Sequence, residues 1–461
     1  MKTFTINTLG CKVNQYESQQ IRELLERNGL KLALKNQIPD LFVVNTCCIT
    51  HSASSKSRQY IKKALKRNSN AVIVVTGCLS KVKIDELQIP LNNVHIIPDS
   101  NNLINALENI KDITFPEPGK QTTNNTVNNK IKPKTHNKIK HKNILSSHSG
   151  LTSLTQFKGH TRAFVKVQDG CDALCTYCII PKTRPFIYSR KMPDVLEEAK
   201  NLVHAGHKEI VITGIFLGAY GKDTVRRKKW DHKVNYELID LIDKLAQIDG
   251  LYRLRLSSLS PMDISEQLMK VFLNHSNIMP HLHLSLQSGS DRILKKMCRQ
   301  YTADDFLQKI HLVKATLDRP AITTDIIVGF PGETEENFQE TLKIAQKAAF
   351  SKIHVFPYSP RKYTPAEKLP NKIKNNVKKL RSRQLQRLSD ELASDFRLKF
   401  IGQNEQILVE KDTGIPTGLS ERYFQVSLQN NGFIVKKNDI ITVKLTQNTD
   451  KYAIGLPVAK N

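Results

Sequence analysis

Three cysteines lie within eight residues of one another in the segment QDGCDALCTYCIIP, residues 168–181. Cys171, Cys175 and Cys178 follow a C-x3-C-x2-C spacing, directly after the apolar stretch AFVKV. Three thiols cannot all pair as disulfides, and a structural zinc site takes four ligands, usually from C-x2-C type pairs. The spacing therefore favours a metal site that uses three thiolates and leaves one coordination position free.

An iron–sulfur cluster satisfies this pattern, since a four-iron cluster is normally held by four thiolates. Three cysteines leave one iron open to a small molecule, and the amino and carboxylate groups of S-adenosylmethionine can chelate it. An electron from the cluster can then split the sulfonium to a carbon radical, which the protein must position and shield. We predict a 4Fe-4S cluster here; the alternative, a zinc knuckle, lacks a fourth ligand at the usual spacing.

Three further cysteines each follow a predicted strand: Cys11 after residues 3–8, Cys47 after 41–46 and Cys78 after 71–77. The carboxyl ends of parallel strands in a doubly wound sheet share one edge, where ligands bind. We therefore expect these thiols to converge on a second cluster with an open iron. The alternative is three ordinary buried cysteines. Only one of the neighbours Cys47 and Cys48 can face such a site, and Cys298 is assigned to packing.

The chain predicts an α/β protein with four segments. Residues 1–115 alternate strands (3–8, 41–46, 71–77, 93–98) with helices (16–28, 52–67), which predicts a doubly wound parallel sheet. Residues 116–160 form a basic, flexible linker. Residues 161–398 hold six strand–helix units, an open or partial (β/α)6 barrel with its chemistry at the strands' carboxyl ends. Residues 399–461 form a small all-β barrel, an architecture often used to grip RNA.

Two details of these segments are specific enough to test. A long helix at 371–399 is expected to bury a stripe made of Ile373, Val377, Leu380, Leu388, Leu392 and Phe396. In the small barrel the expected strands are EQILVE (405–410), YFQVSLQ (423–429), GFIVKK (432–437) and DIITVKLTQ (439–447).

The 461-residue chain carries 70 Lys and Arg against 43 Asp and Glu, a net charge of +27. This surplus favours a polyanionic partner, with nucleic acid first, although a general bias toward lysine is the alternative. No signal peptide is recognised at the N-terminus, and no apolar stretch approaches the ~20 residues that span a bilayer. We therefore expect a cytoplasmic protein without a membrane partner.

With these motifs in place, the sequence resembles the radical S-adenosylmethionine methylthiotransferases, and among them those acting on N6-threonylcarbamoyladenosine in tRNA. The resemblance spans the first and third segments, and LSERYF (419–424) matches the family's TRAM barrel. The matching stretches are TLGCKVNQYES (8–18), VVNTCCIT (43–50), VTGCLS (75–80), GCDALCTYCIIP (170–181), TGIFLGAYG (213–221), RLRLSSLSP (253–261), HLHLSLQSGSDRILKKM (281–297), TTDIIVGFPGETEENF (323–338) and HVFPYSPR (354–361).

The resemblance implies two 4Fe-4S clusters. The one on Cys171, Cys175 and Cys178 cleaves S-adenosylmethionine to a 5′-deoxyadenosyl radical, and the one on Cys11, Cys47 and Cys78 carries or supplies sulfur, which a second S-adenosylmethionine methylates. A methylthio group then replaces hydrogen at C2 of the modified adenine, just 3′ of the anticodon. The S-adenosylmethionine contacts implied by the matching stretches are Thr213, Gly214, Ser285, Gln287, Val328 and Gly329.

The implied partners are the anticodon stem–loop of tRNA, an electron donor and a sulfur donor, both unidentified, and a monomer is expected. Pro185 and Tyr363 stand where the family usually has glycine, and Ser260 stands where it has glutamate. The insert at 222–233 is long and basic, and its Trp230 is a candidate for stacking on a base. The open alternatives are methylthiolation of isopentenyladenosine or of a ribosomal-protein aspartate, and a non-catalytic iron–sulfur protein that binds RNA.

Overall fold

The computed structural model describes residues 2–68, 70–81, 93–109, 151–226, 233–429 and 433–458. It divides into two compact units, one of residues 1–10, 17–47 and 53–153, the other of residues 11–16, 48–52 and 154–461. Most of the predicted linker and Trp230 of the insert lie outside the described residues. The described end of that linker carries Leu154 and Phe157, both buried. Within these ranges, no helix combines the length and the apolar character needed to cross a membrane.

The first unit is built on a five-stranded parallel sheet in the order β2-β1-β3-β4-β5. On the central strand, Val43 packs in one apolar cluster with Ile21 of α1 and Leu103 of α3, while Val44 packs in another with Ile61 of α2. Helices therefore cover both faces, which confirms the doubly wound prediction. The elements are β1 (Thr3–Thr8), α1 (Lys12–Arg27), β2 (Lys31–Leu32), β3 (Leu41–Thr46), α2 (His51–Arg67), β4 (Val72–Gly77), β5 (Val94–Ile96) and α3 (Leu103–Glu108).

The second unit contains the predicted partial barrel. Its strands form the sheets β7-β6-β8-β9 and β10-β11-β12-β13, and β9 and β10 are one strand interrupted at Ser257. The pairings are parallel, except that β7 runs antiparallel to β6. Apart from the short antiparallel β7 at the edge, the spatial order of the strands follows their chain order, as in a (β/α) barrel. The strands are β6 (Arg162–Asp169), β7 (Tyr188–Ser189), β8 (Glu209–Gly214), β9 (Arg253–Leu256), β10 (Ser258–Leu259), β11 (His281–Leu284), β12 (Ala321–Val328) and β13 (Lys352–Pro357).

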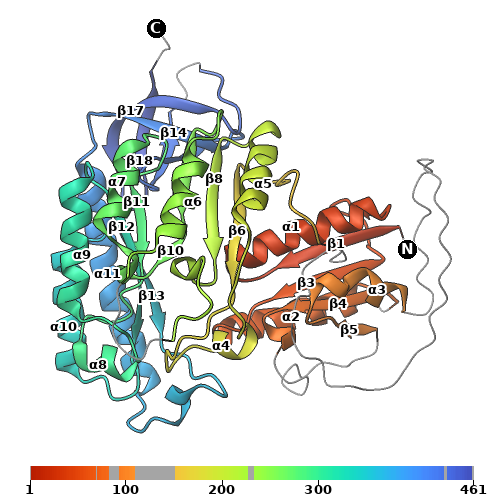
Figure 1. The fold of residues 1–461 in the computed structure, drawn as a ribbon, viewed down its shortest axis with the longest axis horizontal. Helices are drawn as coiled ribbons and strands as arrows, with labels where there is room; N and C mark the ends of the chain where they lie inside the picture. The colour runs from red at the N-terminus through yellow and green to blue at the C-terminus, as the bar shows by residue number, and fades with distance from the viewer. Residues whose placement is uncertain are drawn as a thin grey trace. The chain divides into compact units, whose positions relative to one another are not determined.

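Helices cover the outer side of these strands, as Figure 1 shows for α6, α7, α9 and α10. Outward side chains such as Ile212, Leu284 and Ile326 share one large core with Leu241 of α6 and Phe338 of α10. The helices are α4 (Ile180–Thr183), α5 (Met192–His204), α6 (Tyr236–Ala246), α7 (Glu266–Asn274), α8 (Asp291–Lys296), α9 (Ala303–Thr316), α10 (Glu335–Ala348) and α11 (Asn375–Leu398).

The buried side of α11 differs from the predicted stripe. Leu380 is 64% exposed, while Leu385, which was not predicted, is fully buried. Arg381 turns inward, because its guanidinium pairs with the buried carboxylate of Glu333 at 2.8 Å. An apolar pattern cannot anticipate this inward arginine, so the predicted stripe was partly wrong. Phe396 is buried as expected and packs in the core of the C-terminal barrel.

The C-terminal barrel is closed, with strands in the order β14-β15-β16-β18-β17. The prediction of a small all-β barrel is confirmed, but two of its details were wrong. Residues 433–437 of GFIVKK are not a strand, and the strands at 417–420 and 453–457 were not predicted. The missed strands are short and glycine-containing, so they carry little apolar alternation. The strands are β14 (Asn404–Lys411), β15 (Thr417–Ser420), β16 (Gln425–Leu428), β17 (Ile440–Asn448) and β18 (Ala453–Pro457).

Two buried arginines of β9 join the half-barrel to this small barrel. Arg253 donates to the carbonyl oxygens of Leu419 and Gln406 at 3.0 and 2.7 Å. Arg255 donates to those of Ser420 and Glu421 at 2.8 and 2.7 Å. Both guanidiniums need a buried counter-charge, because an unpaired charge inside a protein is costly. Glu209 at the start of β8 supplies it, at 2.8 Å from Arg255 and 3.7 Å from Arg253.

Candidate active site

The three-cysteine loop begins where β6 ends and closes at helix α4. The backbone N–H of Cys171 donates to the carbonyl oxygen of Arg184 at 2.9 Å, and that of Cys178 donates to Cys175 at 3.1 Å. Two distant segments also hold the loop through backbone hydrogen bonds. The N–H of Thr176 donates to the carbonyl of Met297, and the carbonyl of Thr176 accepts from the N–H of Ala366. The cysteines are thus held at the carboxyl end of a barrel strand, the position that carries chemistry in such folds.

The thiols of this loop suit a metal rather than free thiolate chemistry. Burial raises the pKa of Cys171 to about 11 and that of Cys178 to about 12. A bound cation removes the protons from such thiols, because coordination stabilises the thiolate form. Three soft sulfur donors, each half-buried, are the set that iron–sulfur clusters require. The residues present therefore fit a cluster ligated by three cysteines.

Arg299 is a contact of this loop that sequence reasoning missed. Its guanidinium lies 3.5 Å from the sulfur of Cys175 and donates to the hydroxyl of Tyr301 at 2.9 Å. That hydroxyl donates in turn to the carbonyl of Ser285 at 2.6 Å. A cation beside a thiolate stabilises its negative charge, and hydrogen bonds to sulfur tune cluster potentials. No spacing rule links Arg299 to Cys175, so only the fold could find it.

Gly170 is expected to be essential for the loop, and Gly170→Ala tests this. Its φ of +76° is left-handed, and a Cβ there would overlap the carbonyl oxygen of Phe186. We expect Gly170→Ala to lose most of the iron that this loop binds after anaerobic reconstitution, measured per chain. Gly206→Ala is the matched control, because φ is +96° there but no atom lies within 4 Å of the added Cβ. Equal iron in the two variants would contradict the prediction.

The residues expected to contact S-adenosylmethionine also lie at the carboxyl ends of barrel strands. Thr213 and Gly214 end β8, and a Cβ at Gly214 would lie 2.9 Å from the Gln168 side-chain oxygen. Ser285 directly follows β11, and its N–H donates to the carbonyl of Leu259. These positions place the candidate contacts on the same barrel end as the cysteine loop.

Of the remaining candidate contacts, Gln287 and Gly329 have left-handed backbone conformations. Gln287 has a φ of +66°, and its N–H donates to the carbonyl of Asp325 at 2.8 Å. Val328 ends β12 and is fully buried. Gly329 has a φ of +74° and donates its N–H to the Glu333 carboxylate at 2.6 Å. A left-handed glutamine in a strand-end loop is a strained position of the kind that gathers at ligand sites.

The N-terminal cysteines follow adjacent strands, as predicted. β3 lies between β1 and β4 in the sheet; Cys47 and Cys78 directly follow β3 and β4, and both are buried. The N–H of Cys78 donates to the carbonyl of Thr46 at 3.0 Å, which ties these two strand ends together. Gly77 permits this turn, since its φ is +86° and a Cβ would overlap Asn45 and Thr46. Cys11 is exposed and lies immediately before α1, while Cys48 is fully buried.

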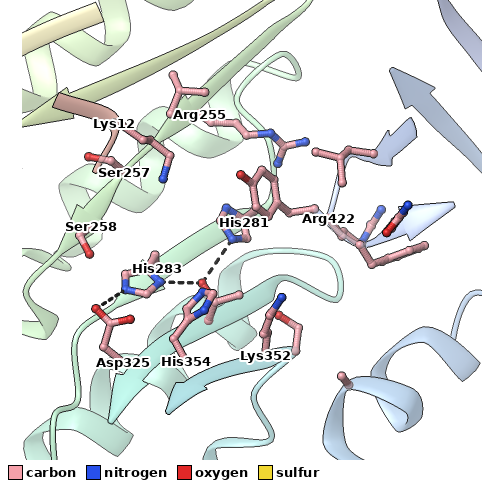
Figure 2. A pocket seen from close by; sticks show the side chains of 18 of the residues that line it. Lys12, Arg255, Ser257, Ser258, His281, His283, Asp325, Lys352, His354 and Arg422 are labelled. Atoms are coloured by element: carbon pink, nitrogen blue, oxygen red, sulfur yellow. Dashed lines mark hydrogen bonds and ion pairs between the residues drawn. The ribbon is translucent and has the colours of Figure 1, made fainter. Parts of the chain in front are cut away.

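A cavity of about 920 Å³ lies on the inner face of the half-barrel. Its volume falls within the range of about 300–1,000 Å³ typical of small-molecule sites. Of the six candidate S-adenosylmethionine contacts, Thr213 and Gly214 line it and the others do not. Figure 2 shows His281, His283, Asp325 and His354 on the neighbouring strands of this face, with Arg255 and Arg422 nearby. Alternation in HLHLSL places His281 and His283 on one side of β11, so the sequence itself carries a signal for this pair.

Tyr363, which replaces a usual glycine, has a left-handed φ of +70° and is 46% exposed. A non-glycine residue in this region costs about 1–2 kcal/mol. We therefore expect Tyr363→Gly to raise the free energy of unfolding, because glycine adopts this conformation without strain. The gain should be at most about 1 kcal/mol, since the greater entropy of glycine in the unfolded chain offsets part of it. Thermal unfolding of the two proteins checks this, and a fall in the midpoint would mean that the ring makes contacts worth more than the strain.

The other two residues that differ from the family pattern, Ser260 and Pro185, have ordinary local structure. Ser260 forms a capping box with Asp263, whose carboxylate accepts from the Ser260 N–H at 2.9 Å. Pro185 is exposed in the chain that leaves α4.

The fold and the three-cysteine loop define the radical S-adenosylmethionine class, and the comparisons agree. Residues 165–345 match the model of the Radical SAM superfamily, and residues 3–97 match uncharacterized protein family UPF0004. The structure of the radical S-adenosylmethionine methyltransferase TsrM from Kitasatospora setae is similar in fold, with a TM-score of 0.52 and 13% identity, over 80% of this chain and 74% of that one.

Curated relatives identify the family more closely. Threonylcarbamoyladenosine tRNA methylthiotransferase MtaB of Bacillus subtilis is 33% identical over 99% of this chain and 96% of its own, and its counterpart from Thermotoga maritima is 35% identical over 94% and 92%. A tRNA-2-methylthio-N(6)-dimethylallyladenosine synthase of Protochlamydia amoebophila is 34% identical over 89% and 86%. The chain belongs to the radical S-adenosylmethionine tRNA methylthiotransferase family.

Proposed function

We propose that this protein installs a methylthio group at C2 of N6-threonylcarbamoyladenosine, just 3′ of the anticodon in tRNA. The three-thiol loop at the end of β6 carries the proposal, since it is the part of the chain built for radical chemistry. The C2–H bond of adenine is too inert for acid–base chemistry at a protein side chain. When bound, the cluster and S-adenosylmethionine would supply the radical that such a bond requires.

In this proposal, residues of the chain bind the cluster and S-adenosylmethionine, orient the adenine and shield the radical from solvent. Cys171, Cys175 and Cys178 would hold the cluster; Thr213, Gly214, Ser285, Gln287, Val328 and Gly329 would contact S-adenosylmethionine. The adjoining cavity would receive the adenine, and its 920 Å³ leaves room for the base with its substituent. The barrel strands, α11 and the C-terminal barrel all contribute to the lining of this cavity, and this lining would help to keep solvent from a reactive carbon centre.

We further propose a second 4Fe-4S cluster on Cys11, Cys47 and Cys78, as the source of sulfur. Support comes from the strand order, because each cysteine follows one of three adjacent parallel strands and β3 lies between the other two. Soft sulfur ligands at the carboxyl edge of a doubly wound sheet suit an iron–sulfur group.

The proposed partner is the anticodon stem–loop of tRNA. The net charge of +27 favours phosphate contacts, and the closed C-terminal barrel, a TRAM-like module in this proposal, has the architecture of RNA-gripping domains. The electron and sulfur donors remain to be identified, and we propose a cytoplasmic monomer.

A second candidate substrate is dimethylallyladenosine in tRNA, because a relative with 34% identity bears that activity in its name. The test is to incubate the reconstituted enzyme with S-adenosylmethionine, reductant and tRNA bearing either modification, followed by nucleoside mass spectrometry. Product from the threonylcarbamoyl tRNA alone supports the proposal. Product from the dimethylallyl tRNA alone would replace it with the second candidate.

A further inference from the structure

Five side chains form a polar wall on the inner face of the half-barrel: His281, His283, Asp325, Lys352 and His354. All five line the cavity, and Figure 2 shows them on neighbouring strands. Their placement follows from strand register. Thr323 lies beside His283 on one side and Lys352 on the other, and Asp325 lies beside His354. Since paired residues of parallel strands share a face, the sheet puts these polar groups in two adjacent rows.

Hydrogen bonds organise this polar wall. His283 Nδ1 lies 2.9 Å from the Thr323 hydroxyl, which lies 3.4 Å from His281 Nε2. His283 Nε2 lies 3.3 Å from the Asp325 carboxylate. Both nitrogens of His283 are therefore engaged, which disfavours a metal on His283, Asp325 and His354, although their ligand atoms lie within 4.8 Å of one another. The wall is better suited to hydrogen bonding with a ligand.

The protonation of His281 and His354 also favours hydrogen bonding with a ligand. Burial lowers the pKa of His281 and of His354, so both rings are neutral at physiological pH. A neutral imidazole offers one donor and one acceptor nitrogen. Such groups match a carbamoyl or a hydroxyl, each of which both donates and accepts. They match an alkyl group poorly, because covering them without a partner costs free energy.

Lys352 is the cation of this wall that remains available to a ligand. Within the described part of the chain, no hydrogen bond or ion pair engages its exposed ammonium. The cavity's arginines are occupied; for example, Arg255 pairs with Glu209, and Arg422 pairs with Glu405 at 3.0 Å. The nearby carboxylates are also engaged, Asp325 with His283 and Glu410 with Arg162 at 2.8 Å. Lys12 and Lys451 also line the cavity, but they lie outside the polar wall, so an anionic group placed against the wall would meet the free ammonium of Lys352.

We propose that the polar wall selects the N6 substituent of the target adenosine, with Lys352 pairing with the threonyl carboxylate and His354 hydrogen-bonding the carbamoyl group. This inference rests on the proposed function and names the residues that would decide between its two candidate substrates. The dimethylallyl group has no charge and no hydrogen-bonding atom, so it would bury the wall without satisfying it. Sites built to hydrogen-bond a substrate reject analogues that lack the matching group far more strongly than apolar pockets reject extra atoms.

The experiment measures binding and turnover of the reconstituted enzyme with three anticodon stem–loops. One carries threonylcarbamoyladenosine, one carries its threonine amide, which lacks only the negative charge, and one carries dimethylallyladenosine. The variants are Lys352→Met and His354→Leu, with Lys347→Met as the matched control, since Lys347 is an exposed lysine in the last turn of α10. Dissociation constants come from fluorescence titration, which does not depend on turnover.

We expect Lys352→Met to weaken binding of the threonylcarbamoyl stem–loop about 10–100-fold, the scale of a lost charge-assisted contact, with KM rising more than kcat falls. The same variant should change binding of the amide and dimethylallyl stem–loops by less than about threefold. His354→Leu should weaken both carbamoyl-bearing ligands and spare the dimethylallyl one.

Three outcomes separate the inference from the proposed function. If Lys352→Met and Lys347→Met weakened the binding of every stem–loop equally, the inference would be overturned. Such a result would mean that both lysines only attract the RNA backbone in general. Normal discrimination by both wall variants, with methylthio product from the wild type, would also overturn it while keeping the reaction. If Lys352 were needed for selective binding but the wild type formed no product, the role of the polar wall in selecting the substituent would be supported. The proposed methylthiolation reaction would be refuted.

Discussion

Replacing Cys171, Cys175 and Cys178 together by alanine is expected to lower the iron content of the reconstituted protein from about eight to about four per chain, with complete loss of methylthio product. The loop supplies all three of the protein's ligands to the proposed radical-generating cluster, so no partial activity should remain. Iron and sulfide analysis of anaerobically reconstituted protein, together with nucleoside mass spectrometry, makes the measurement. Cys298→Ala is the matched control; Cys298 is exposed, so the packing role expected from the sequence was wrong.

The companion variant replaces Cys11, Cys47 and Cys78. It should also retain about four irons, and it should still cleave S-adenosylmethionine under reducing conditions while forming no methylthio product. A wild type with about four irons, all lost with the loop cysteines, would show that the N-terminal cysteines are structural. The proposal of a sulfur-supplying cluster would then be withdrawn, and the loop assignment would stand.

Glu209→Gln should strongly destabilise the second unit. Glu209 is fully buried and lies between Arg253 and Arg255, each 1% exposed. Burial, together with the charge of Arg255, already lowers the pKa of Arg253 to about 10. Removing one partner of a buried ion pair typically costs about 3–5 kcal/mol, because the remaining charge is left uncompensated. Both arginines also donate to barrel carbonyls, so the C-terminal barrel should loosen with them.

Urea unfolding and limited proteolysis measure this effect. The transition of Glu209→Gln should move to lower urea, and cleavage should begin in the region of residues 399–461. The control is Asp240→Asn, which removes a 2.9 Å pair with Lys244 on the surface of α6, where both side chains are 48% exposed. Exposed pairs contribute about 0–1 kcal/mol, so this variant should behave like the wild type. A similar shift in both variants would mean that the Glu209 network does not hold the barrel.

Much of the fold could be read from periodicity. Strands 3–8 and 41–46 have the predicted bounds, and each of the six predicted barrel strands exists. Strongly apolar strands between amphipathic helices leave few alternatives, because a parallel sheet must be covered on both faces. The weaker signals failed: GFIVKK has the composition of a strand but is not one in its described part, and Leu380 fits an apolar stripe but faces solvent. Composition and spacing alone therefore do not decide which segment pairs in a sheet or which side chain of a helix is buried.

The sequence by itself predicted the metal-binding chemistry of this protein, since three cysteines within eight residues lie close together in any fold. The tertiary structure alone decided what surrounds that chemistry. Arg299 reaches Cys175 from 124 residues away, and Lys352 and His354 join His283 and Asp325 only because β11, β12 and β13 are neighbours in register. Local spacing fixes ligands that are close in the chain. Charge partners and cavity walls come from distant segments, and folding brings them together through the burial of apolar faces that carry no functional signal.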